Sequence, residues 1–176
     1  MIQTERLLLR HWTPNDLPAM IRLNEDQEVM RYFPEQLSPE QSKGLLAIFI
    51  RHQEDHQFVY FAAETLDTQE FIGFIGLKWQ TYESHFTPCI DIGWRLLPAA
   101  WGKGYATEGA KACLAYGFNT LKLKEIYAIC PVVNQASEKV MQRLGMTKVD
   151  EFNHPAMPED SPLNPCNLYL IKQEEY

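Results

Sequence analysis

The chain has 176 residues, 45% of them hydrophobic, which is enough for one domain with a substantial core. Sixteen basic and 23 acidic residues give a net charge of −7, which argues against nucleic-acid binding, because such proteins neutralise phosphates with basic side chains. The chain contains no run of 18 apolar residues and no signal-peptide pattern, so we expect a cytoplasmic protein without membrane contact.

The first half of the chain mixes strand and helix patterns. A short run around three leucines predicts a strand over 6–12, and capping residues followed by proline predict helices over 14–23 and 39–54. Two further apolar runs, at 58–64 and 71–78, read as strands joined by a polar turn.

The most informative stretch covers residues 89–108. Apolar residues at alternate positions predict a strand, which Pro98 ends because proline cannot donate to a ladder. Gly102 and Gly104 then precede a helical pattern over 105–119. Such a loop can turn several N–H groups toward one point, where the helix dipole adds positive charge, and phosphate is the usual ligand there. The pattern alone fits a simple glycine turn equally well.

The last third of the chain predicts a strand over 125–130, a helix over 135–144 and strands over 149–152 and 168–172. The expected order is therefore β-α-α-β-β-β-α-β-α-β-β, with seven strands and about four helices. We find no repeat and no linker, and we expect a single domain over residues 1–176.

The glycine loop resembles the acetyl-CoA loop of the GNAT superfamily of N-acetyltransferases. The family pattern, Q/R-x-x-G-x-G/A, falls on residues 101–106, and Trp101 replaces the usual Gln or Arg, as in the branch of ribosomal-protein N-terminal (Rim-type) acetyltransferases. The resemblance implies an α+β fold with a mixed, twisted sheet that is splayed open between strands 4 and 5. It also implies acetyl-CoA as cofactor, held by Leu96, Leu97, Trp101, Gly102, Lys103, Gly104, Tyr105, Ala106, Thr107, Asn134 and Ser137.

Acetyl transfer needs a stabilised oxyanion and a proton for the departing thiolate. We expect backbone groups of Leu96 and Leu97 to stabilise the oxyanion. The family often places a tyrosine where this chain has Met141, so the resemblance points instead to Ser137, three residues after Asn134. An ordinary helix start, with Asn134 as its cap, is the alternative interpretation of both residues.

The general base and the acceptor site are less clearly marked. Asp91 and Glu151 are the candidate bases, with a solvated strand or loop position as the alternative for each. An α-amine has a reference pKa near 7.7–8.0, so such an acceptor needs positioning more than a strong base. We expect the acceptor site to include Tyr32, Phe33, Trp79 and His154.

Metal and thiol chemistry receive little support. His52 and His56 are four residues apart, but they lack the glutamate spacing of zinc proteases and an obvious third ligand, so we expect no metal site. The four cysteines form no C-x-x-C motif. We expect free thiols, with Cys166 exposed in a loop.

The resemblance thus implies an acetyl-CoA-dependent N-acetyltransferase that joins cofactor and amine in a ternary complex by direct attack. The expected acceptor is an amine-bearing peptide, first of all a ribosomal-protein α-amine. The alternatives are a small-molecule amine such as an aminoglycoside, polyamine or amino acid, a non-catalytic acyl-CoA-binding module, and a metal hydrolase. The protein is expected to be a monomer or a homodimer.

Overall fold

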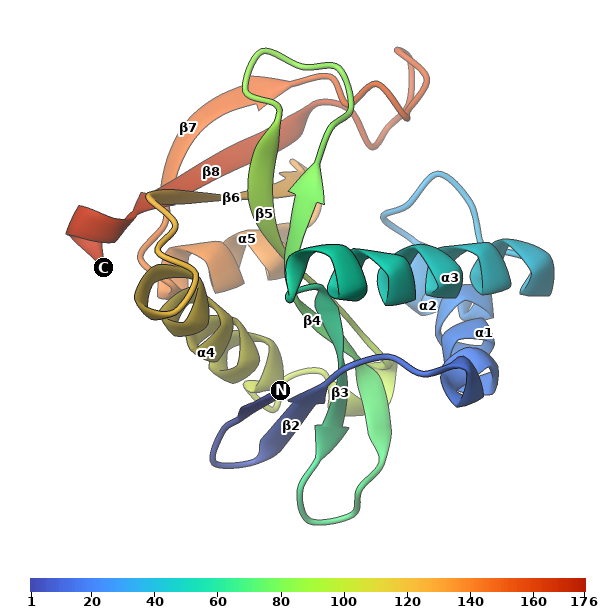
Figure 1. Ribbon diagram of the computed structural model, residues 1–176. Helices are drawn as coiled ribbons and strands as arrows, with labels where there is room; N and C mark the ends of the chain where they lie inside the picture. Colours follow the sequence, from blue (N-terminus) through green and yellow to red (C-terminus); the bar gives the residue numbers. More distant parts are fainter.

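The computed structural model describes residues 1–176 and confirms the α+β architecture with a mixed sheet (Figure 1). Eight strands form one sheet in the order β1-β2-β3-β4-β5-β6-β8-β7. The strands are β1 Ile2–Gln3, β2 Leu7–Arg10, β3 Tyr60–Thr65, β4 Phe71–Gln80, β5 Cys89–Leu96, β6 Glu125–Pro131, β7 Thr147–Phe152 and β8 Cys166–Lys172. The sequence predicted all but β1, because two residues are too short to show an alternation.

Five α-helices join the strands, and only the single turn α2 was not predicted. The longest helix is held at its start by a reciprocal pair of hydrogen bonds, in which the Ser38 hydroxyl accepts from the Gln41 N–H and the Gln41 side chain accepts from the Ser38 N–H. The helices are α1 Leu17–Glu25, α2 Gln27–Met30, α3 Pro39–His56, α4 Tyr105–Asn119 and α5 Gln135–Arg143.

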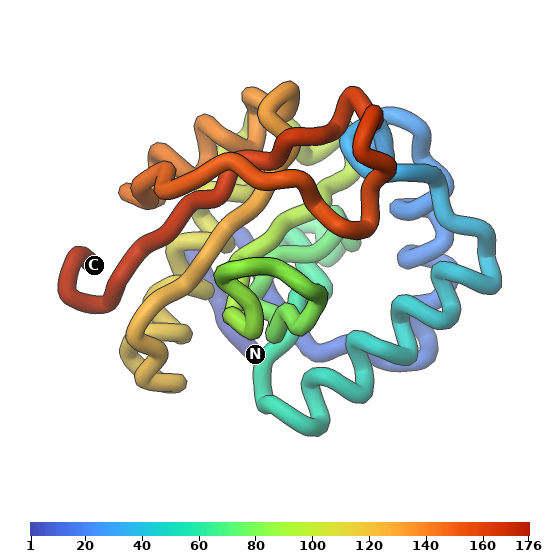
Figure 2. The backbone as a smooth tube through the Cα atoms, turned by 90° about the horizontal axis from the view of Figure 1, so that it is seen from above, coloured from blue at the N-terminus to red at the C-terminus, as the bar shows by residue number.

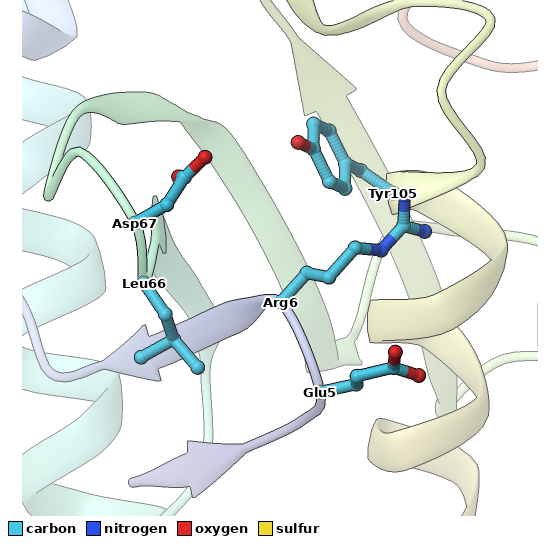
Figure 3. A pocket seen from close by; sticks show the side chains of 5 residues that line it. All are labelled: Glu5, Arg6, Leu66, Asp67 and Tyr105. Carbon is cyan, nitrogen blue, oxygen red and sulfur yellow. The ribbon is translucent and has the colours of Figure 1, made fainter.

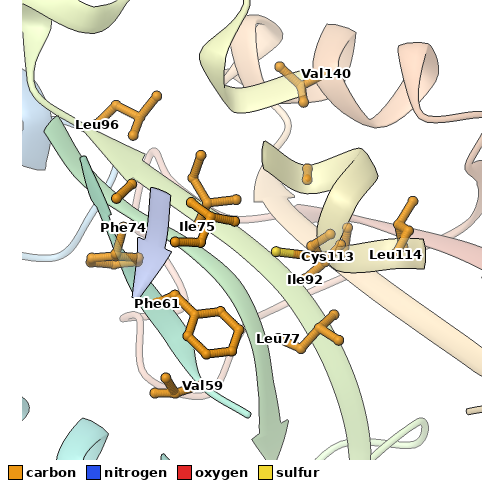
Figure 4. Packing of buried hydrophobic residues seen from close by; sticks show 14 of the residues in the cluster. Val59, Phe61, Phe74, Ile75, Leu77, Ile92, Leu96, Cys113, Leu114 and Val140 are labelled. Atoms are coloured by element: carbon orange, nitrogen blue, oxygen red, sulfur yellow. The ribbon is translucent and has the colours of Figure 1, made fainter. Parts of the chain in front are cut away.

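Helices cover both faces of the sheet. On one face α4 packs against β4 and β5, where Ile75 and Ile92 meet Cys113 and Leu114 in the apolar core (Figure 4). On the opposite face α3 places Phe49 against the rings of two sheet residues, Tyr60 and Phe74. Successive strand residues point to opposite faces, so every second residue of β5 belongs to each layer.

The sheet opens between β5 and β6, as predicted. These parallel strands share one ladder pair, Asp91 with Tyr127, whereas β5 pairs with β4 along its whole length. Figure 1 shows β6, β7 and β8 turning away from the other strands. In Figure 2 the segment that follows His154 approaches the α2 region across the opening, and both line the same cleft.

Three details differ from the sequence expectations or complete them. All four cysteines are free and buried, and Cys166 is only 1% exposed because it begins β8 between Phe152 and Pro131, so its predicted exposure was wrong. Both ring nitrogens of His52 already have main-chain partners. No helix has the length and apolar character needed to cross a membrane.

The close contact of β3 and β4 predicts a stability effect. A Cβ atom on Gly76 would lie 2.1 Å from the carbonyl oxygen of Val59, so the backbone must move to admit it. We expect Gly76→Ala to destabilise the fold by about 1–3 kcal/mol and to lower the Tm by several degrees.

Gly44→Ala is the matched control. Gly44 lies inside α3 with no atom within 4 Å of the added methyl group, so alanine should raise the Tm slightly through its better helix propensity. Thermal melts of both variants test this contrast, and equal shifts would contradict it.

Candidate active site

A cleft with a volume of about 970 Å³ opens where β5 and β6 part. One wall comes from the segment after α2 together with β3, β4 and β5, and the other from β6, α5 and residues 154–157. The loop between β5 and α4 closes one end. The cleft therefore combines free main chain at the sheet opening with a glycine loop.

The loop before α4 offers a set of unused donors. The amide N–H groups of residues 102–107 make no hydrogen bond within the protein, and no side chain caps the helix. Gly102 and Gly104 have φ angles of 73° and 83°, a left-handed conformation that favours glycine. Free N–H groups at a helix N-terminus attract anions through both hydrogen bonding and the helix dipole.

Arg6 fixes the position of this loop (Figure 3). Its Nε donates to Glu108 Oε2 at 2.7 Å, its Nη1 donates to the Lys103 carbonyl at 3.0 Å, and its guanidinium lies 4.7 Å from the Tyr105 ring centroid. The Thr4 hydroxyl donates to the other oxygen of Glu108 at 2.6 Å. The first turn of α4 is thus tied to the N-terminal strands before any ligand binds.

These residues fit the diphosphate of acetyl-CoA. A Cβ atom on Gly102 would meet nothing within 4 Å, so the loop borders open space. Trp101 lies beside Gly102, and its indole Nε1 donates to the Leu96 carbonyl at 2.7 Å. This hydrogen bond helps to hold the loop against the end of β5. The side chain of Lys103 does not line the cleft. The expected positions that do line it are Leu96, Trp101, Gly102, Gly104, Tyr105, Ala106, Thr107, Asn134 and Ser137.

The oxyanion donor predicted at Leu97 needs correction. The Leu97 N–H donates to the Ile72 carbonyl at 2.8 Å and is already engaged. Antiparallel ladders alternate, so the N–H of the preceding residue, Leu96, faces away from β4 toward the opening. Of the two residues, only Leu96 has a donor available to the cleft.

Asp91 is buried in the cleft wall, and its interpretation as a solvated strand residue was wrong. It is 7% exposed and accepts a hydrogen bond from the Tyr60 hydroxyl at 2.5 Å, and Gln80 donates to that hydroxyl at 2.9 Å. Burial raises the pKa of Asp91 to about 6, although the Tyr60 hydrogen bond acts in the opposite direction. A carboxylate with such a pKa is ionised at pH 7 and can accept a proton.

Asn134 and Ser137 lie at the start of α5 and line the opposite wall. The Asn134 side chain accepts from the Ser137 N–H at 3.2 Å, which confirms its role as a helix cap. Ser137 stands in the first turn of α5 and lines the cleft.

Of the residues expected as a base or at the acceptor site, two lie outside the cleft. Glu151 is on the edge strand β7 and forms an ion pair with Lys148 at the surface, and Trp79 is 38% exposed beyond the cleft lining. The periodicity of a strand gives its faces but not its neighbours, which explains both errors. The cleft lining does include Tyr32, Phe33 and His154.

Several cleft residues were not found from the sequence. Tyr60 and Gln80 support Asp91, and Arg95 stands further along the same face of β5. The hydroxyl of Tyr82 is buried without a hydrogen-bond partner, and its ring lies 4.6 Å from that of His154. Strand alternation could have placed Arg95 on the same face as Asp91, but no sequence signal brings β3 and the loop after β4 to them.

Comparison with protein families identifies the fold. The family model "Acetyltransferase (GNAT) domain" matches residues 6–147. The chain is 30% identical to the uncharacterized N-acetyltransferase YnaD of Bacillus subtilis, with 99% of this chain and 98% of YnaD aligned. It is 27% identical to the spermidine N(1)-acetyltransferase of Escherichia coli K12, with 83% and 75% aligned.

Solved structures agree. A GNAT-family acetyltransferase from Bacillus anthracis superimposes with a TM-score of 0.79 at 27% identity, covering 99% of both chains. The ribosomal L7/L12 α-N-protein acetyltransferase RimL superimposes with a TM-score of 0.78 at 17% identity, covering 96% of this chain and 95% of RimL. At that identity the likeness concerns the fold alone, so the Rim-type branch is one neighbour among several.

The buried carboxylate predicts a pH-dependent stability effect. Because the pKa of Asp91 is raised in the folded state, the protein loses stability as pH rises through about 6. Asparagine resembles the protonated acid and does not titrate. The free energy of unfolding of Asp91→Asn, relative to wild type, should therefore be higher at pH 8 than at pH 5 by on the order of 1 kcal/mol. Chemical denaturation at both pH values measures it.

Asp16→Asn is the control of opposite sign. Burial would raise the pKa of Asp16, but its ion pair with Arg10, at 2.6 Å, outweighs that and lowers it. Its stabilising contribution is therefore complete at pH 5 and unchanged at pH 8, so this variant should be destabilised equally at both. If the free energy of unfolding of Asp91→Asn differs from that of wild type by the same amount at pH 5 and pH 8, Asp91 is not buried in its ionised form.

Proposed function

Because the chain belongs to the GNAT family of acetyltransferases and uses acetyl-CoA to acetylate an amine, we propose that its acceptor is the α-amine of a peptide. The observation that supports this most is the charge of the cleft. Its lining includes four basic side chains, Arg31, Arg95, Lys139 and Arg143, against two acidic ones, Glu28 and Asp91. This excess of positive charge favours an acceptor with a single amine.

A polyamine is the second candidate, because a spermidine N(1)-acetyltransferase is among the relatives. A polyamine carries several positive charges, and each one inside the cleft needs a nearby carboxylate. One of the two available, Glu28, already pairs with Arg31 at 3.2 Å. The cleft therefore offers Asp91 alone to a cationic group, which matches one amine.

The proton chemistry also suits an α-amine. Its reference pKa near 7.7–8.0 leaves roughly a tenth of it neutral at pH 7. Deprotonating a lysine amine, with a pKa near 10.4, costs about 4–5 kcal/mol at that pH. With a pKa of about 6, Asp91 can take a proton from an α-amine but is a weak base for a lysine. Tyr60 holds the carboxylate in place through its hydrogen bond.

The remaining roles follow from the cleft walls. Acetyl-CoA, when bound, supplies an acyl carbon activated by its thioester. The amides of residues 102–107 would hold the diphosphate, and the Leu96 N–H would stabilise the oxyanion. On the opposite wall, Ser137 would pass a proton to the departing sulfur, giving its hydroxyl proton and taking one back from water.

The cofactor loop can be tested with a matched pair of variants. Gly102→Asp places a carboxylate in open space next to the unused amides, where it should repel the diphosphate, and Gly102→Asn adds the same shape without charge. Asparagine and aspartate both tolerate a positive φ, so neither should unfold the protein. We expect acetyl-CoA to bind at least tenfold more weakly to Gly102→Asp than to Gly102→Asn in calorimetric titrations. If both variants bind acetyl-CoA with equal affinity, the diphosphate does not bind at this loop.

The acceptor class is tested by the release of CoA thiol with a panel of amines. We expect turnover with a short peptide that has a free N-terminus, none with the same peptide acetylated at its N-terminus, and little with spermidine. A lysine-containing peptide with a blocked N-terminus is the control for side-chain amines. Faster turnover of spermidine than of the free peptide would contradict a peptide acceptor and support a polyamine instead.

A further inference from the structure

Arg95 is a cation in the cleft without a counterion. It lines the cleft from β5, and its Nη1 donates to the Asn24 side chain at 2.6 Å. Its guanidinium lies 3.9 Å from the ring centroid of Phe33 and 5.1 Å from that of Phe74. Its Nε is buried without a hydrogen-bond partner, and Arg95 takes part in none of the ion pairs of the structure.

The protein itself supplies no carboxylate for this charge. Glu28 is engaged by Arg31, and Asp91 accepts its hydrogen bond from Tyr60. A charge without a counterion and an unused buried donor are both unfavourable, and an anion that reaches the guanidinium from the cleft would neutralise the charge. Arginine is also the side chain best suited to a carboxylate, because its planar fork offers two parallel donors.

The guanidinium is held in a fixed position. Asn24 is fully buried in α1 and donates to the Ser42 hydroxyl of α3 at 3.2 Å, so two helices set the place of its side-chain oxygen. With the ring of Phe33 on the guanidinium as well, Arg95 has little freedom to turn away. A donor that is already ordered loses less entropy when it binds a ligand.

Arg95 also stands at a defined place relative to the proposed base. Asp91 and Arg95 share one face of β5 and are four residues apart, which separates their Cα atoms by roughly 13 Å in a strand. Gly93 lies between them, and a Cβ atom there would come within 3.0 Å of the Tyr60 ring, so that ring occupies the intervening space. An acceptor whose amine reaches Asp91 must therefore pass over the Tyr60 ring to reach Arg95, and all three residues line the same cleft.

We propose that Arg95 binds a carboxylate of the acceptor, so that the preferred substrate is an amine that carries an acidic group a few residues or bonds away. For a peptide this is an acidic side chain at the second or third position, or the C-terminus of a very short peptide. The proposal rests on the proposed peptide acceptor. It does not follow from the overall charge of −7, which would favour a cationic partner.

The experiment compares Ser-Glu-Ala-Ala-amide with Ser-Gln-Ala-Ala-amide, which differ in one charge, at saturating acetyl-CoA. We expect wild type to favour the Glu peptide at least tenfold in kcat/KM. Arg95→Met should bring the ratio close to one, and Arg95→Lys, which keeps the charge but loses the fork, should give an intermediate ratio. Arg31→Met is the control, because Arg31 lines the same cleft but already has a carboxylate partner, and it should keep the wild-type ratio.

A second pair, Ser-Ala with a free C-terminus and Ser-Ala-amide, distinguishes the two sources of the carboxylate. A wild-type preference for the free dipeptide alone assigns Arg95 to a C-terminus, and a preference within the longer pair assigns it to a side chain. Equal rates within both pairs would overturn the role of Arg95, as would an Arg95→Met variant that melts cooperatively and keeps the wild-type ratio. If no peptide releases CoA while another amine does, the proposed peptide acceptor fails instead.

Discussion

The function of this protein depends on one interruption of backbone pairing. β5 is paired with β4 along its whole length, but β6 joins it only at Asp91 and Tyr127. Beyond that pair the main chain of β5 has a free edge, and an unpaired N–H group away from water is unfavourable. An extended ligand that enters the opening can replace the missing strand, so the sheet is stable as a domain and incomplete at its active site.

A second requirement is that the glycine loop be in place beside this opening. Its amides are useful only if they stay unused by the protein, and a loop without internal hydrogen bonds is held poorly by itself. Arg6 resolves this conflict, since it binds the Lys103 carbonyl and Glu108, in the first turn of α4, from outside while leaving the amides free. The turn between β1 and β2 thus serves the cofactor site although it lies outside the cleft.

The sequence predicted what depends on local rules. The order of strands and helices apart from β1 and α2, the glycine turn before α4 and the cap at Asn134 were all found this way. The errors involve neighbours that are distant in the sequence. Leu97 is engaged by Ile72, and Trp79 falls outside the cleft, because of pairings that a single strand cannot reveal. The same limit hid the hydrogen bond from Tyr60, which changes a strand carboxylate into a candidate base.

Charge shows most clearly why local structure decides the acceptor. The net charge of −7 suggests a cationic partner, but most of the acidic side chains are exposed, and exposed charges are screened beyond about 8 Å at physiological ionic strength. In the lining of the cleft, basic side chains outnumber acidic ones four to two. In the proposed site, Asp91 would provide one place for an amine and Arg95 one place for an anion. Two opposite charges on one face of β5 would then select both the identity and the orientation of a substrate, which neither could do alone.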